Sequence, residues 1–208
     1  MIFEQFSNFG IVPIVVIDDA QNAAPLAKIL SENGLLCHEI KFKAAAEEAI
    51  KIISREFPDI LIGAGSVTSI DQAERAINAG AKFISCSGIT PQIAQYCLDE
   101  SVPVTPGVQT PTEVEQALDL SLTVVNFFPA EAAGGIKMIK ALANEYDYLK
   151  FMPTGGINSK NIRDYLAYEK VVACGCYWIT QDLINNAEWD KISTLVKNIV
   201  ELVKEVRS

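Results

Sequence analysis

The chain has 208 residues, half of them hydrophobic, and a formal net charge of −9 from 17 basic and 26 acidic residues. This length can bury one core and is close to the minimum for an eight-stranded α/β barrel. So acidic a composition argues against nucleic acid and anionic membrane as partners, and no apolar run approaches the roughly 20 residues of a membrane span. A small anionic substrate stays compatible with it, because a few local donors can override the global field.

The cysteines indicate buried, reduced thiols. Their number is odd, no C-x-x-C pair occurs, and Cys174-Gly-Cys176 is too tight for the usual structural zinc spacing. The first ten residues lack the basic start and apolar run of a signal peptide. We therefore expect a cytoplasmic protein without a metal. The five cysteines are Cys37, Cys86, Cys97, Cys174 and Cys176.

The first half of the chain predicts four strand–helix units. Residues 11–17 form a continuous β-branched run, as expected for a strand buried on both faces. Gly34 ends the first long helix, and Ser69 with Gln72 forms a capping box for a later one. In chain order, we expect strands at 11–17, 35–42, 60–63 and 83–85, and helices over 18–32, 44–57, 69–80 and from 90 onward.

The second half repeats this alternation. Thr110 and Glu113 form another capping box, with proline at the first helical position. We expect strands at 102–105, 122–127, 149–152 and 171–174, and helices from 110 onward, over 135–143, over 159–167 and over 189–206. Roughly the first eight residues predict a short extra helix that covers the bottom of the barrel.

Eight strands, each followed by a helix, predict an α/β fold: a single (β/α)₈ TIM barrel spanning residues 1–208, with that short N-terminal helix. A doubly wound open sheet is the alternative. The first strand ends in Ile17-Asp18-Asp19-Ala20, however, and so lacks the glycine-rich fingerprint of a dinucleotide-binding sheet.

Charged residues on the second strand mark the expected pocket. Strand alternation puts Glu39, Lys41 and Lys43 on one face, pointing into the barrel, with Glu39 and Lys41 about 7 Å apart along the strand. Unpaired charge in a packed core costs several kcal/mol, roughly, so a functional pocket is the favoured interpretation. A structural Glu–Lys network is the alternative. His38 alternates with them, and we expect it to be packed outside the barrel rather than catalytic.

Glycines after the seventh strand favour an anion site. Gly155 and Gly156 precede a helix and offer bare backbone N–H groups, a suitable cradle for phosphate. The same glycines could simply turn the chain. Active sites of such barrels lie at the carboxyl ends of the strands, where this pair is found.

Four motifs resemble those of the 2-keto-3-deoxy-6-phosphogluconate (KDPG) / 4-hydroxy-2-oxoglutarate (KHG) aldolase family. They are Gly63-Ala-Gly-Ser-Val67, Pro106-Gly-Val-Gln-Thr-Pro-Thr-Glu113, Phe127-Phe-Pro-Ala-Glu-Ala132 and Pro153-Thr-Gly-Gly-Ile157. The resemblance covers essentially the whole chain. It implies a homotrimeric class I aldolase that splits a 2-keto-4-hydroxy acid into pyruvate and an aldehyde. It also implies a Schiff-base lysine, a glutamate that moves protons, and no metal or other cofactor.

The resemblance assigns several roles by position. Glu39 matches the acid/base glutamate, and Ser66 matches a position where the family usually has threonine. The remaining matches are Phe128 as an aromatic lining residue, and Thr154, Gly155 and Gly156 as part of the substrate- and phosphate-contacting loop.

Departures from the family pattern cluster in the same pocket. Asn126 stands at the position of the Schiff-base lysine, and Lys43 at that of the arginine that would clamp the substrate carboxylate. The usual Ser-Pro-Gly reads Cys86-Ser87-Gly88, which leaves Ser87 as a substrate-binding candidate. The usual Gly-Gly-Ser-Trp reads Gly175-Cys176-Tyr177-Trp178, so Gly175, Cys176 and Tyr177 are the phosphate-binding candidates. The bulk of Cys176 and Tyr177 predicts a preference for a non-phosphorylated substrate.

Asparagine cannot form a Schiff base, because its amide nitrogen is not nucleophilic. We hypothesise that Lys41 supplies the amine instead, with Glu39 or Tyr177 as proton shuttle. Lys43 could carry the same role. The alternatives are a weakened aldolase, a catalytically silent member that binds a small keto acid or serves as a trimeric scaffold, and an engineered barrel rebuilt for another reaction.

Overall fold

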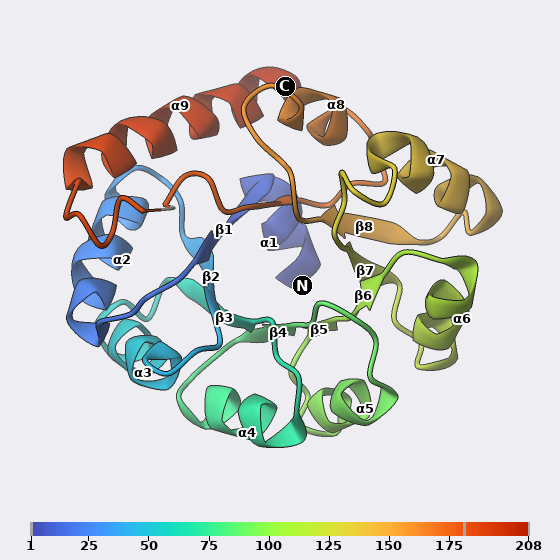
Figure 1. Ribbon diagram of the computed structural model, residues 1–208, viewed down its shortest axis with the longest axis horizontal. Coiled ribbons are helices and arrows are strands. Elements are labelled where there is room, and N and C mark those ends of the chain that lie inside the picture. The colour runs from blue at the N-terminus through green and yellow to red at the C-terminus, as the bar shows by residue number, and fades with distance from the viewer. Residues whose placement is uncertain (1, 181, 208) are drawn as a thin grey trace.

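Parallel strands form the centre of the molecule, and helices surround them (Figure 1). The computed structural model describes residues 2–180 and 182–207. One sheet has six strands in the order β5-β4-β3-β2-β1-β9, and a second has three in the order β6-β7-β8. Every neighbouring pair is parallel. The expected alternation of parallel strands and covering helices is therefore confirmed.

The strands are short and mostly buried. They are β1 (Ile11–Val15), β2 (Cys37–Lys41), β3 (Leu61–Gly65), β4 (Phe83–Ser85), β5 (Val104–Thr105), β6 (Gly107–Val108), β7 (Val124–Phe127), β8 (Lys150–Pro153) and β9 (Cys174–Cys176).

The helices follow the strands around the ring. They are α1 (Ile2–Phe9), α2 (Ala23–Glu32), α3 (Ala46–Glu56), α4 (Ile70–Asn78), α5 (Pro91–Asp99), α6 (Pro111–Asp119), α7 (Gly135–Glu145), α8 (Ile162–Leu166) and α9 (Trp189–Arg207). No described helix is long and apolar enough to cross a membrane.

Three elements differ from the prediction. The eighth strand, expected at 171–174, is β9 at Cys174–Cys176. The other two differences have identifiable reasons. The helix expected over 18–32 starts with a 3₁₀ turn, Ala20–Asn22, which Asp19 caps by accepting from the Gln21 N–H. The α-helix itself begins at Ala23, since Pro25 lacks an N–H and is tolerated only in a first turn. The strand expected at 102–105 is β5. After Pro106 the chain forms a separate two-residue strand, β6, which belongs to the other sheet.

Ladder pairing stops at the junctions between the sheets. Between β8 and β9 the only pairings among the described residues are the isolated parallel bridges Phe151↔Val171 and Thr154↔Gly175. On the other side, β5 and β6 flank Pro106. The structure thus shows a strongly curled parallel sheet in two parts.

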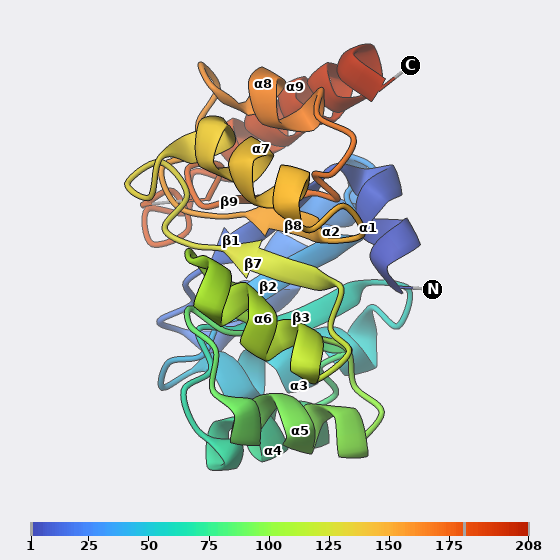
Figure 2. The same ribbon diagram turned by 90° about the vertical axis from the view of Figure 1, so that its right-hand side faces the viewer.

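The amino end of the strands is closed by an apolar plug. Phe6 of α1 packs edge-on against Phe83 of β4, with ring centroids 4.9 Å apart, and α1 lies across this end (Figures 1 and 2). The rest of this cluster is Val12, Cys37, Val124, Met152, Val172 and Ala173. Because the interior is filled here, an internal site has room only toward the carboxyl ends of the strands.

The larger core lies between the strands and the outer helices. His38 is fully buried and alternates along β2 with Cys37 and Glu39, which face inward, so its ring lies on the helix side, as predicted. Neither ring nitrogen has a hydrogen-bond partner among the described residues, and burial lowers the pKa of His38 to about 4. All five cysteines are buried and unpaired.

Candidate active site

A cavity of about 320 Å³ opens at the carboxyl ends of the strands. This is the edge at which parallel α/β barrels carry their active sites. Most predicted site residues lie together there. The lining is Ile14, Glu39, Lys41, Ser66, Ser85, Ser87, Asn126, Phe128, Thr154, Gly155, Gly156, Ile157, Gly175 and Tyr177.

Glu39 is the buried ionisable group of this cavity. Strand β2 holds it with only 6% of its surface exposed. Burial raises the pKa of Glu39 to about 7, while a hydrogen bond with the Ser85 side chain and the charge of Lys41 act in the opposite direction. A carboxyl group with this pKa is populated in both protonation states near neutral pH, which suits it to proton transfer.

Lys41 brings an amine into the same cavity. It follows Glu39 by two residues on β2, so both side chains leave the strand on the cavity face. Among the described lining residues it is the only lysine or arginine. An amine and a carboxyl group with a raised pKa therefore share one cavity.

Asn126 is fixed on the opposite wall. It lies on β7, is 5% exposed, and donates from Nδ2 to the Cys86 carbonyl oxygen at 2.9 Å. Its Oδ1 is buried and has no partner among the described residues. Since an unpaired buried acceptor is costly, this oxygen is available to a donor on a bound ligand.

The glycine pair after β8 forms the next wall. Gly155 and Gly156 have φ angles of 96° and 81°, which favour glycine. The loop is held to the β7 turn, because the Ala130 and Glu131 N–H groups donate to the Thr154 and Gly155 carbonyls at 2.7 and 3.1 Å. Neither the Gly155 N–H nor the Gly156 N–H donates to another of the described residues, so both are available to an acceptor on a ligand.

Comparison with known proteins assigns this architecture to a family. The family model described as KDPG and KHG aldolase matches residues 2–195. The 2-dehydro-3-deoxy-phosphogluconate aldolase of Haemophilus influenzae is 44% identical over 205 residues, which cover 98% of this chain and 97% of that protein. The chain belongs to the KDPG and KHG aldolase family.

Other family members agree over nearly the full length. The KHG/KDPG aldolase of Escherichia coli is 34% identical over 196 residues, covering 93% of this chain and 92% of that protein. The KDPG aldolase of Legionella pneumophila, solved with pyruvate captured as a covalent carbinolamine, superposes with a TM-score of 0.90 at 35% identity, covering 93% of this chain and 95% of that one.

Lys43 of this aldolase-family chain lies elsewhere than expected. It does not line the main cavity but a neighbouring polar one of about 180 Å³, together with Asp18 and Tyr177. Strand β2 ends at Lys41 and the chain bends at residue 43, so the alternation of strand faces does not extend to Lys43. The inward orientation predicted for Lys43 is therefore wrong, while Tyr177 borders both cavities.

Cys176 is the second exception. Its side chain is 0% exposed and packs in the outer core, because Gly175 occupies the cavity face of β9 and the next residue points away from it. A side chain at Gly175 would overlap the Thr154 hydroxyl. Of the two residues expected to add bulk next to Gly175, only Tyr177 lines the cavity.

Three lining residues were not among the predicted site residues. Ser85 ends β4 and hydrogen-bonds with Glu39, and Ile14 and Ile157 supply apolar wall. The position of Ser85 at the end of a strand could have indicated a site residue. A single hydroxyl group is uncharged, however, so its burial does not by itself indicate a functional pocket. The two isoleucines look like core residues in the sequence.

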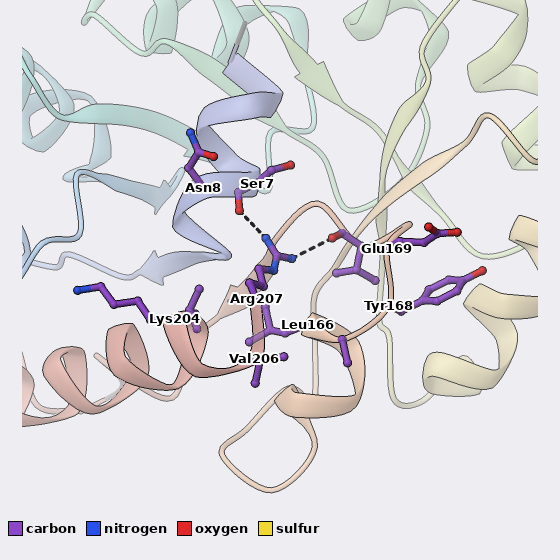
Figure 3. A pocket seen from close by; sticks show the side chains of 11 residues that line it. Ser7, Asn8, Leu166, Tyr168, Glu169, Lys204, Val206 and Arg207 are labelled. Carbon is purple, nitrogen blue, oxygen red and sulfur yellow. Dashed lines mark hydrogen bonds between the residues drawn. The ribbon is translucent and has the colours of Figure 1, made fainter.

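A larger hollow of about 760 Å³ lies at the other end of the molecule. Arg207 of α9 donates there to the Ser7 carbonyl oxygen and so ties α9 to α1 (Figure 3). It also donates to the carbonyl oxygens of Val171 and Val172 in the segment before β9. None of the predicted site residues lines it. The described residues also contain no group of three His, Cys, Asp or Glu side chains placed to hold a metal ion.

Proposed function

We propose that this chain is a carbon–carbon lyase that cleaves a 2-keto-4-hydroxy acid into pyruvate and an aldehyde through a Schiff base on Lys41. One observation carries the proposal: the Lys41 amine and the Glu39 carboxyl group, whose pKa is about 7, line the same cavity. The covalent pyruvate adduct of the Legionella pneumophila relative supports a keto acid as the ligand. The proposal includes a closed eight-stranded single-domain barrel, a homotrimer and a cytoplasmic location, and requires no cofactor.

The reaction begins with addition of the neutral Lys41 amine to the C2 carbonyl. Loss of water from the resulting carbinolamine gives an iminium ion, which serves as the electron sink. The Glu39 carboxylate takes the proton of the C4 hydroxyl, the C3–C4 bond breaks, and its electron pair moves to the nitrogen to give an enamine while the aldehyde leaves. Glu39 then returns the proton to C3. Addition of water releases pyruvate and the free amine.

Asn126 has a supporting role in this scheme. The family resemblance puts the Schiff-base lysine at this position, and an amide cannot replace it as a nucleophile. Its Oδ1 has no partner within the described part of the chain and can accept a hydrogen bond from the carbinolamine hydroxyl. The free N–H groups of Gly155 and Gly156 are donors for an oxygen of the substrate.

The Asn126 side chain also favours a second candidate function, which is binding without catalysis. An oxygen held ready in a buried wall can bind a small keto acid without any covalent step. A catalytically silent member of this kind, naturally diverged or engineered, would retain the cavity and serve as a binding protein or trimeric scaffold.

Pyruvate release from KDPG, from 4-hydroxy-2-oxoglutarate and from the unphosphorylated 2-keto-3-deoxygluconate distinguishes the lyase from the silent member. The lyase proposal expects turnover that Lys41→Met lowers by on the order of 1000-fold, because the covalent route is lost. Lys51→Met, an exposed lysine on α3, is the matched control and should retain full activity. Turnover unchanged in Lys41→Met contradicts the assigned amine, and no turnover by the unmodified chain favours the silent member.

A further inference from the structure

A second cavity of about 180 Å³ adjoins the main one at the carboxyl ends of β1, β2 and β9. Tyr177 lines both cavities, so the two spaces meet at this side chain. The full lining of the second cavity is Val16, Asp18, Lys43, Tyr177, Thr180, Asp182, Ile184 and Asn185. Most of these side chains carry hydrogen-bonding groups, in contrast to the mixed lining of the main cavity.

Two hydrogen bonds hold the segments that surround the second cavity. Thr180 is 2% exposed and donates from Oγ1 to the carbonyl of Ile14 at 3.1 Å. Ile14 lines the main cavity, so this bond fixes the loop after β9 against β1 where the two spaces meet. Asn185 donates from Nδ2 to Asp18 Oδ2 at 3.0 Å and braces the far side of the second cavity.

Charge and hydrogen-bonding capacity indicate what this cavity can hold. Asp18 and Asp182 carry two negative charges and Lys43 one positive charge, which leaves a formal charge of −1. A phosphate would face two carboxylates and only one cation. A chain of hydroxyls fits the same set, because carboxylates accept hydrogen bonds from hydroxyl groups while ammonium and amide groups donate to them.

We propose that the second cavity is a subsite for the neutral polyhydroxyl end of the substrate. This inference rests on the proposed lyase function in assigning the keto-acid end to Lys41 and Glu39. The carbons beyond the cleaved bond then pass Tyr177 and place their hydroxyls between Asp18, Asp182 and Lys43. The favoured aldehyde product is an unphosphorylated polyhydroxy aldehyde.

Binding of two aldonates tests the subsite without turnover. Gluconate and 6-phosphogluconate have no keto group, so neither can form a Schiff base, and they differ only in the distal phosphate. Calorimetric titration of the full chain should show tighter binding of gluconate. Asp182→Asn should weaken gluconate binding about tenfold, as expected for loss of one charge-assisted hydrogen bond, and should narrow the discrimination against phosphate.

The chosen variant preserves the backbone. Asp182 has a φ of 60°, a region that asparagine adopts as readily as aspartate, so Asp182→Asn should fold normally. Asp119→Asn, at an exposed position on α6, is the matched control and should leave both affinities unchanged. Circular dichroism of each variant establishes that the fold is intact.

The outcomes separate this inference from the proposed function. Gluconate that fails to bind, binds no better than 6-phosphogluconate, or is unaffected by Asp182→Asn would overturn the subsite, even if pyruvate is trapped on Lys41. Gluconate binding that depends on Asp182 supports the subsite, even in a chain that forms no pyruvate adduct. In that case the lyase proposal fails and the polyol-binding cavity stands.

Discussion

Glu39 lies directly over Gly65 of the neighbouring strand. A β-carbon at Gly65 would overlap the Glu39 carboxylate, and Gly65 is also the register partner of Lys41 on β2. Because Gly65 has no side chain, it leaves the space that the Glu39 carboxyl group occupies. The shape of the candidate site depends on this glycine as much as on the ionisable residues.

Gly65→Ala is expected to disable the site while leaving the fold in place. The added methyl group displaces the Glu39 carboxyl group, and misplacement by about 1 Å costs on the order of 100-fold in rate. Gly88→Ala is the control, since a β-carbon there meets nothing within 4 Å. Steady-state kinetics and thermal unfolding should show lost turnover with little loss of stability. Equal activity in the two variants would contradict the inference that the space at Gly65 positions the Glu39 carboxyl group.

The ionisation of Glu39 should appear in the pH dependence of stability. Its pKa is raised from 4.5 to about 7, so the folded chain binds the proton more tightly than the unfolded chain. The stabilisation of the folded chain by protonated Glu39 is fully present below about pH 4.5, declines as the pH rises toward 7, and is absent above pH 7. Glu39→Gln should therefore be more stable than the unmodified chain at pH 8, by about 3 kcal/mol, and should lose this advantage by pH 4.5. Urea unfolding at the two pH values measures the difference, and a pH-independent difference would contradict the raised pKa.

Much of this architecture could be predicted from sequence patterns. Thr110 and Glu113 form the predicted capping box, and the Ser69 side chain accepts from the Gln72 N–H as expected. These signals are local, because each depends on residues within one helical turn. The inward positions of Glu39 and Lys41 also followed correctly from strand alternation.

The errors arose where local rules stopped applying. Lys43 lies past the end of β2, and Cys176 took the outer face of β9, so both positions depended on where a strand begins or ends. Ser85 and Ile14 join the site only through the curvature that brings β4 and β1 to one cavity. Tertiary contacts of this kind have no signature in the spacing of residues along the chain.

A lysine at position 126 should revive a chain that lacks Lys41. Asn126 lines the same cavity as Glu39, so Asn126→Lys provides an amine within reach of the same carboxyl group. In the Lys41→Met background, it should raise pyruvate release by on the order of 100-fold. Asn126→Met in that background controls for loss of the bond to the Cys86 carbonyl. A double variant as inactive as Lys41→Met alone would show that the cavity does not hold the keto acid as proposed.

Arg207 should contribute to stability and not to activity. Its guanidinium donates to three backbone carbonyls of two separate segments at the end of the molecule opposite the site. Arg207→Met should lower the free energy of unfolding by about 1–3 kcal/mol, because these acceptors lose their partner. Lys204→Met, on an exposed position of the same helix, should change it by less than about 0.5 kcal/mol. Denaturant unfolding measures the free energy of unfolding of both variants. Equal losses in the two would contradict a stabilising role for the Arg207 hydrogen bonds.

The identity of the reactive amine is tested most directly by borohydride reduction in the presence of pyruvate, followed by peptide mass mapping. We expect a stable pyruvate adduct on the peptide that contains Lys41, with modification located at that residue by fragmentation. Lys41→Met should abolish the adduct, and Lys43→Met should retain it, because Lys43 lies in the neighbouring cavity. An adduct on Lys43, or no adduct on any lysine of the unmodified chain, would contradict the assignment of Lys41 as the reactive amine.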